Sequence, residues 1–169
     1  MATSTILQKL DPVTDPLVSG TVGSTSITMD RGQYETFIAR ETLVVGDWVA
    51  FDYAATAAAD VTLGVFKADG NSVPVRTPFG VVVSADSTSG LLTSGSRVKV
   101  CIAGVCSASV GDNAAAGNAI GVLLQITNTA GTADLAAAAS TQPVRGVLAE
   151  TVPAAAGITL KRVVVIKQF

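Results

Sequence analysis

The sequence predicts an all-β protein: a single β-barrel or sandwich-like body of short antiparallel strands with an extended N-terminal arm. Three observations lead to this prediction. Short runs alternate apolar with polar residues, turn-forming residues separate these runs, and the apolar residues are mostly small or β-branched. Hydrophobic residues make up 49% of the 169 residues but aromatic residues only 5%, so Ala and Val must fill the core. We divide the chain into an arm, residues 1–22, and one body, residues 23–169.

The N-terminal arm is polar and is interrupted by two Asp-Pro steps, Asp11-Pro12 and Asp15-Pro16. Proline lacks a backbone donor and restricts the residue before it to extended geometry, so a helix is not expected. The segment is either a disordered tail or an extended arm that becomes ordered on a partner. In the second case the arm would contact a neighbouring subunit, and the candidate partner-binding residues are Leu7, Leu10, Pro12, Pro16, Leu17 and Val18.

The body begins with a strand-like pattern over residues 24–53, with a turn at Gly46-Asp47 and strand alternation from Trp48 to Tyr53. The only Trp and both Tyr lie in this part of the chain, so we expect the densest part of the core here. Further strand-like runs follow at residues 61–66, 73–83, 121–127, 144–149 and 160–167. In the last of these, a continuous apolar run over residues 163–166 predicts a strand that is covered on both faces.

Residues 97–110 are predicted to form a hairpin, because strand alternation stops at Ala103-Gly104 and then resumes. A two-residue turn would set Cys101 opposite Cys106. A three-residue loop with Gly104 in the left-handed conformation would instead keep the apolar residues of both strands on one face. We favour this second register, which predicts that Cys106 points inward, that Cys101 points outward and that no disulfide joins them.

An internal repeat relates residues 80–100 to residues 146–165. Both stretches begin with Gly-Val, pass through a loop of small residues and end in a valine strand after a basic residue. The repeat predicts two similar strand–loop–strand units, and coincidence in a chain rich in Val and Ala is the alternative. Among the Ala-rich patches, only residues 134–139 are expected to contain a helical turn, because short isolated helices are marginal.

The sequence offers no recognisable catalytic or metal-binding set. It has no histidine, which is the usual general base near neutral pH, and its two cysteines lack a known zinc spacing. Ser96 and Lys99 match the Ser-x-x-Lys string of penicillin-recognising enzymes, but in a strand these side chains point to opposite faces. Asp69-Gly70-Asn71 is typical of a turn and not of a calcium site. We therefore expect no enzymatic activity, no catalytic residue, no cofactor and no metal.

The charge pattern limits the kinds of partner. Charged residues make up only 14% of the chain and the formal net charge is −2, so the basic footprint of a nucleic-acid-binding protein is missing. No apolar run is long enough for a transmembrane helix, and no secretory signal is evident, so we expect neither membrane insertion nor export. Low charge gives weak protection against self-association, so we expect much of the surface to be covered by a partner.

From Gly80 to Phe169 the sequence resembles the small decoration, or cement, proteins of tailed-bacteriophage capsids. The resemblance lies in Gly-Val strands, a turn at Gly111-Asp112 followed by an Ala/Gly loop, and a closing strand over residues 162–166. It implies a virion protein on the capsid surface, synthesised in the host cytoplasm, that cements adjacent major capsid protein subunits. It also implies a homo-oligomer, either a dimer or a trimer, without catalytic residues.

Two other functions stay open at this point. One is a carbohydrate- or receptor-binding β module of a phage tail or fibre, although such sites normally use exposed aromatic residues and this chain has few. The other is a structural protein that assembles by itself into shells or tubes. A glycan-binding screen would identify the first, and electron microscopy of the purified protein would identify the second.

Overall fold

The computed structural model describes residues 32–51, 63–70, 77–85, 91–111, 119–136, 143–154 and 156–167. The regular elements within these ranges are strands, which confirms the predicted all-β fold. They are β1 (Gln33–Ala39), β2 (Leu43–Val44), β3 (Trp48–Phe51), β4 (Gly64–Lys67), β5 (Gly80–Ala85), β6 (Leu91–Leu92), β7 (Arg97–Val110), β8 (Leu123–Ile126), β9 (Ala133–Leu135), β10 (Gly146–Leu148) and β11 (Thr159–Val165).

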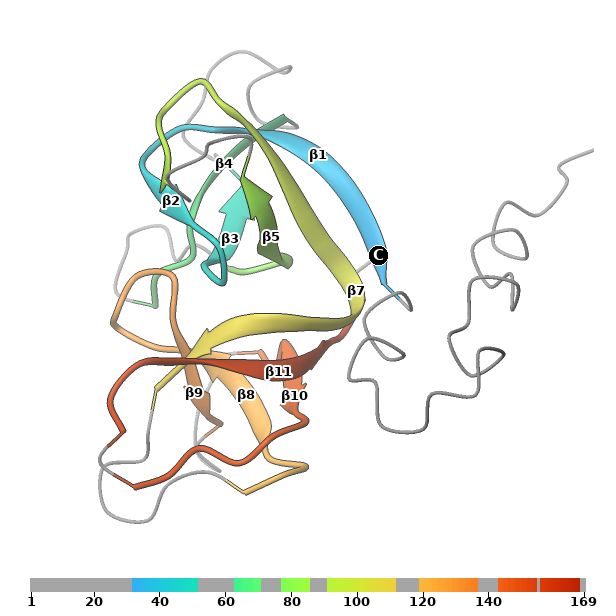
Figure 1. The fold of residues 1–169 in the computed structure, drawn as a ribbon, viewed down its shortest axis with the longest axis vertical. Coiled ribbons are helices and arrows are strands. Elements are labelled where there is room, and N and C mark those ends of the chain that lie inside the picture. Colours follow the sequence, from blue (N-terminus) through green and yellow to red (C-terminus); the bar gives the residue numbers. More distant parts are fainter. Residues whose placement is uncertain are drawn as a thin grey trace, which may run out of the picture.

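The strand β7, 14 residues long, belongs to two closed sheets. The first runs β1-β4-β3-β5-β7 and closes where β1 pairs with β7, and the second runs β7-β11-β10-β8-β9 and closes where β9 pairs with β7. Within the described residues the body therefore consists of two five-stranded barrels that share one strand (Figure 1). Most pairings are antiparallel, as expected, but β1–β4 and β7–β9 are parallel.

The shared strand changes its partner at Ala103-Gly104. Its first half pairs with β1 as far as Ala103, and its second half pairs with β11 from Gly104 onward. Figure 1 shows β7 turning sharply between the two barrels. Gly104 has φ +98°, a conformation that residues with a Cβ rarely adopt.

The hairpin predicted for residues 97–110 is therefore wrong. Gly104 does have a positive φ, as predicted, but the chain bends there without reversing direction. The two halves do not pair with each other, because strands from elsewhere in the chain supply the partners of each half. Sequence alternation identified the two apolar runs and could not show that they form one bent strand.

The first barrel encloses an aromatic cluster. The rings of Phe51 and Phe79 are stacked, with centroids 3.9 Å apart, and the ring of Phe37 meets that of Phe79 edge-on at 5.1 Å. Val98 and Val100 from β7 pack in the same core. Aromatic pairs of this kind each contribute about 0.5–1.5 kcal/mol beyond the burial of their area.

The second barrel has a core of smaller side chains, and Trp48 connects it to the first barrel. Trp48 lies on β3 of the first barrel but is fully buried in the core of the second. Its indole Nε1–H donates to the carbonyl of Ser109 on β7 at 3.2 Å, and its backbone N–H donates to the carbonyl of Gly131 at 3.0 Å. A Cβ on Gly146 would lie 2.9 Å from the indole Cη2, so only glycine fits beside this ring.

The turn that precedes Trp48 is held by Asp47, a buried carboxylate. Its Oδ2 accepts a hydrogen bond from the backbone N–H of Val44 at 2.9 Å and lies 3.3 Å from Lys67 Nζ. Burial raises the pKa of Asp47 above its usual value, although Val44 and Lys67 both favour the charged form. The carbonyl of the adjacent Gly46 accepts from the N–H of Ser109 at 2.8 Å, which attaches the turn to β7.

Both cysteines are buried and carry free thiols, so the prediction of no disulfide agrees with the structure. The prediction that Cys101 faces solvent is wrong. Its side chain points away from the first barrel's interior, as alternation required, but the bend in β7 places the second barrel over it. A hydrogen bond with Cys101, together with burial, raises the pKa of the Cys106 thiol.

Other local predictions had mixed outcomes. The helical turn predicted within residues 134–139 is wrong at its start, because Asp134 lies in β9, where it pairs with Gln125, and residues 137–139 lie outside the described residues. Val164 and Ile166 are 37% and 39% exposed, so the last strand is not covered on both faces, because the barrel encloses only one side of β11.

The two stretches of the predicted repeat each contain an antiparallel pair, β5 with β7 in the first barrel and β10 with β11 in the second. The boundary between arm and body at residue 22 lies outside the described residues.

The bend predicts a specific requirement for glycine. Gly104→Ala should lower the free energy of unfolding by about 1–3 kcal/mol, because a Cβ is strained at this φ. Urea denaturation followed by Trp48 fluorescence would measure the change. Ser107→Ala, a half-buried position on the same strand, is the control and should change stability by less than about 0.5 kcal/mol. Equal effects from the two variants would contradict a glycine-dependent bend.

Asp47 should give stability a defined pH dependence. The pKa of Asp47 is higher in the folded protein than in the unfolded chain, where it is 3.8. The stability that Asp47 contributes is therefore fully present below pH 3.8 and is lost as the pH rises through the pKa of the folded state. The unfolding free energy of the wild type, relative to Asp47→Asn, should therefore fall with rising pH in urea titrations between about pH 3 and 7. Glu150→Gln is a control for which the opposite pH dependence is expected. Lys161 lowers the pKa of Glu150, so the stability that Glu150 contributes is lost as the pH falls. Parallel curves for the wild type and Asp47→Asn would refute this role.

The two buried thiols should be unreactive in the folded protein. Without reductant, a thiol reagent should modify neither cysteine in the native state and both after unfolding in denaturant, because burial keeps the reagent away from both sulfur atoms. The readout is the number of modified thiols per chain. Finding no free thiol in the unreduced, unfolded protein would show that a disulfide is present.

Candidate interaction surfaces

The described residues do not assemble a recognisable reaction centre. No group of three or more His, Cys, Asp or Glu side chains in them is placed to hold a metal ion. Ser96 precedes β7 and its hydroxyl lies 3.2 Å from that of Thr93, while Lys99 lies on the strand itself. None of the described segments forms a helix with the length and apolar character needed to cross a membrane. The features with potential for binding are two surfaces, a groove and an apolar row.

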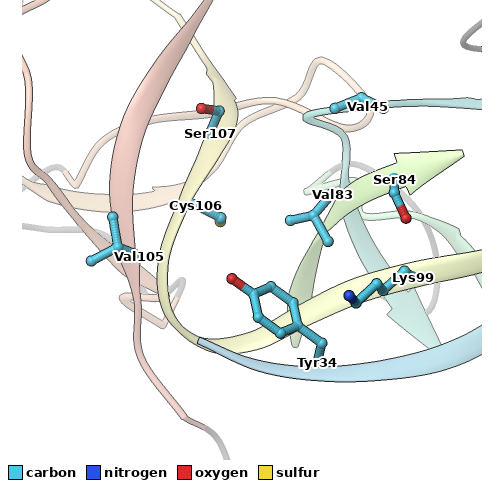
Figure 2. A pocket seen from close by; sticks show the side chains of 8 residues that line it. All are labelled: Tyr34, Val45, Val83, Ser84, Lys99, Val105, Cys106 and Ser107. Carbon is cyan, nitrogen blue, oxygen red and sulfur yellow. The ribbon is translucent and has the colours of Figure 1, made fainter. Parts of the chain in front are cut away.

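The groove lies on the inner side of the bend in β7 and is called the bend groove below. Its main part is a pocket of about 430 Å3, shown in Figure 2. A smaller pocket of about 280 Å3 continues it along the first barrel and shares Ser84 and Lys99 with it. The residues that line the two parts are Tyr34, Thr36, Val45, Val83, Ser84, Arg97, Val98, Lys99, Val105, Cys106 and Ser107.

Strand register explains how these residues come together. Thr36 on β1 and Ser84 on β5 both pair with Lys99 on β7, so the three side chains lie on the same outward face of the first barrel. Tyr34, two residues before Thr36, lies on this face as well. Beyond the bend, the second half of β7 forms the opposite wall, where Val105 lines the pocket.

The bend groove is apolar on one side and basic along its floor. Lys99 Nζ lies 4.8 Å from the centroid of the Tyr34 ring, a cation–π contact that Figure 2 shows at the base of the pocket. Such a contact contributes about 0.5–1 kcal/mol at an exposed site. Arg97 provides a second cation in the smaller part of the groove. The described residues that line the groove include no carboxylate, so the groove would favour an anionic ligand.

The second surface is a row of apolar side chains on the outside of the second barrel, called the apolar row below. Register pairs Val105 with Val164, Val164 with Val147, and Val147 with Leu123, so the four residues cross β7, β11, β10 and β8 on one face. Leu123 is 49% exposed and Val164 37%. Four adjacent strands span about 14 Å between the outer two. Because Val105 also lines the bend groove, the row and the groove meet at the bend.

The sequence-predicted contact residues and these surfaces do not coincide. Leu7, Leu10, Pro12, Pro16, Leu17 and Val18 all lie outside the described residues. Sequence reasoning missed the groove because its residues come from β1, β5, β7 and a turn that are distant in the chain. The available signal was the alternation of Arg97 and Lys99 with buried valines, which predicts a basic outer face on this strand.

Comparisons with known proteins give little further information. No protein-family model matches the chain, and no curated protein sequence matches it either. Among solved structures, the N base of the head fiber protein gp8.5 of bacteriophage phi29 superposes with a TM-score of 0.48 at 17% identity, covering 79% of this chain and 93% of that chain. This degree of likeness is too low to assign a function.

Proposed function

We propose that this chain is a non-enzymatic structural protein of a tailed-phage virion that binds the outside of the capsid and joins adjacent major capsid protein subunits. The apolar row is the observation that carries this proposal. Val105, Val147, Val164 and Leu123 present a continuous apolar face on ordered strands, which is typical of a surface that another protein covers. The sequence resemblance to capsid decoration proteins suggests the identity of that partner.

The composition supports the same proposal. Only 14% of the residues are charged, and the chain has no histidine, so its chemistry suits contact with another protein better than catalysis. A protein that binds the assembled shell but not free capsid subunits stabilises the shell by mass action. As a homo-oligomer it would engage several capsid subunits at once and gain further affinity through effective concentration. The N-terminal arm, residues 1–22, is proposed as an additional contact with a neighbouring subunit.

The apolar row can be tested by a charge substitution. Leu123→Glu should weaken binding to capsids of the parent phage by about tenfold or more, because a carboxylate would have to be buried in the interface. Co-sedimentation of the purified protein with empty shells would measure binding. Leu91→Glu is a matched control, since Leu91 is 48% exposed and lies on β6, away from the row.

The expected result is a loss for Leu123→Glu and unchanged occupancy for Leu91→Glu. Equal capsid binding by both variants would show that the apolar row is not the capsid contact. Failure of the wild type itself to bind shells, under conditions where it is folded, would refute the proposed function. A positive glycan screen in that case would favour a carbohydrate-binding module.

A further inference from the structure

The bend groove has the chemistry of a site for an extended acidic peptide. Val45, Val83 and Val105 provide apolar contacts, while Lys99 and Arg97 provide two cations along the same groove. The described lining has no carboxylate that would repel an anionic ligand. A complementary ligand therefore carries acidic residues interleaved with apolar ones in an extended backbone.

One segment of the same chain has this composition. Residues 10–18 read Leu-Asp-Pro-Val-Thr-Asp-Pro-Leu-Val, with two carboxylates and six apolar or proline residues between and around them. No Lys or Arg occurs from residue 10 to residue 30. Each proline restricts the preceding Asp to extended geometry, so little conformational entropy remains to be lost when the segment binds as a strand-like peptide.

The chain also enters the body beside this groove. The first strand begins at Gln33, which pairs with Ala103 at the bend, and the next residue, Tyr34, lines the groove. Residues 19–31 connect the acidic segment to this point, and 13 residues can span up to about 40 Å. A tether of this length gives an effective concentration of the order of millimolar, so a weak contact would suffice for docking.

We propose that residues 10–18 dock in the bend groove of the same molecule. In this state Asp11 and Asp15 lie beside Lys99 and Arg97, and the apolar residues of the segment contact the valines of the groove. The docked segment excludes other acidic peptides from the groove until it is displaced. This inference does not depend on the proposed capsid role, because it concerns the free protein.

Hydrogen exchange on the full-length protein tests the docking. In the wild type, backbone amides of residues 10–18 should exchange at least about tenfold more slowly than in an unstructured peptide. Lys99→Glu should reduce this protection to less than about twofold, because it replaces attraction by repulsion at the groove. Lys161→Glu makes the same change in net charge at a residue that lines neither part of the groove and pairs with Ala108, four residues beyond the bend, so it should leave the protection unchanged. Unchanged protection in Lys99→Glu would overturn the proposal.

Substitutions in the segment provide a second test that does not alter the groove. Asp11→Asn with Asp15→Asn should reduce protection as strongly as Lys99→Glu does, with no change in the unfolding curve of the body. Exchanging the charges, Asp15→Lys together with Lys99→Glu, should recover at least half of the wild-type protection. If the uncharged variant remains fully protected, the ionic pairing is refuted.

The concentration dependence identifies the occupant. Docking within one molecule predicts equal protection at about 2 and about 200 μM protein. Protection that appears only at the higher concentration would overturn the proposal in favour of exchange of the segment between copies. Absence of protection at both concentrations would overturn docking altogether. Neither result bears on capsid binding by the apolar row, which is read in a separate assay.

Discussion

The architecture depends on one strand, β7, which provides hydrogen-bond partners to two sheets. Each half of β7 closes a barrel, so each barrel would have open edges without it. Ala103 is the last residue that pairs with β1 and Gly104 the first that pairs with β11, so the direction of the strand must change between them. The positive φ of Gly104 provides that change. The backbone conformation at this one place thus sets the direction in which the second half of the strand leaves the first barrel.

The turn before Trp48 makes the two barrels a single packed unit. Among the residues that the structure describes, one ladder pair joins β7 to β9 in the second barrel, Val110 with Ala133. The turn from the first barrel fills this gap, because Gly46 accepts from Ser109 and Trp48 donates to Gly131. The indole of Trp48 completes the apolar core of the second barrel. A buried carboxylate, which would be unfavourable elsewhere, is retained beside this turn because it orders the backbone through Val44.

Both candidate surfaces are consequences of the bend. Its inner side forms the groove between Lys99 on one half of the strand and Val105 on the other. Val105 also begins the apolar row that continues across the second barrel to Leu123. Hydrophobic residues make up 49% of the chain, and some of them, such as Leu123 and Val164, remain exposed on the outside. A chain of this composition can therefore act through surface contact while its core remains closed.

The sequence by itself determined the all-β class, the approximate positions of most strands and the positive φ at Gly104, because alternation and glycine are local signals. Tertiary structure alone decided that the runs around Gly104 form one strand, and therefore that Cys101 is buried and that Val164 is exposed. These outcomes depend on which strands, distant in the chain, supply the hydrogen-bond partners of β7. A pattern of period two records that a strand has two faces, but it carries no information about which other part of the molecule covers each face.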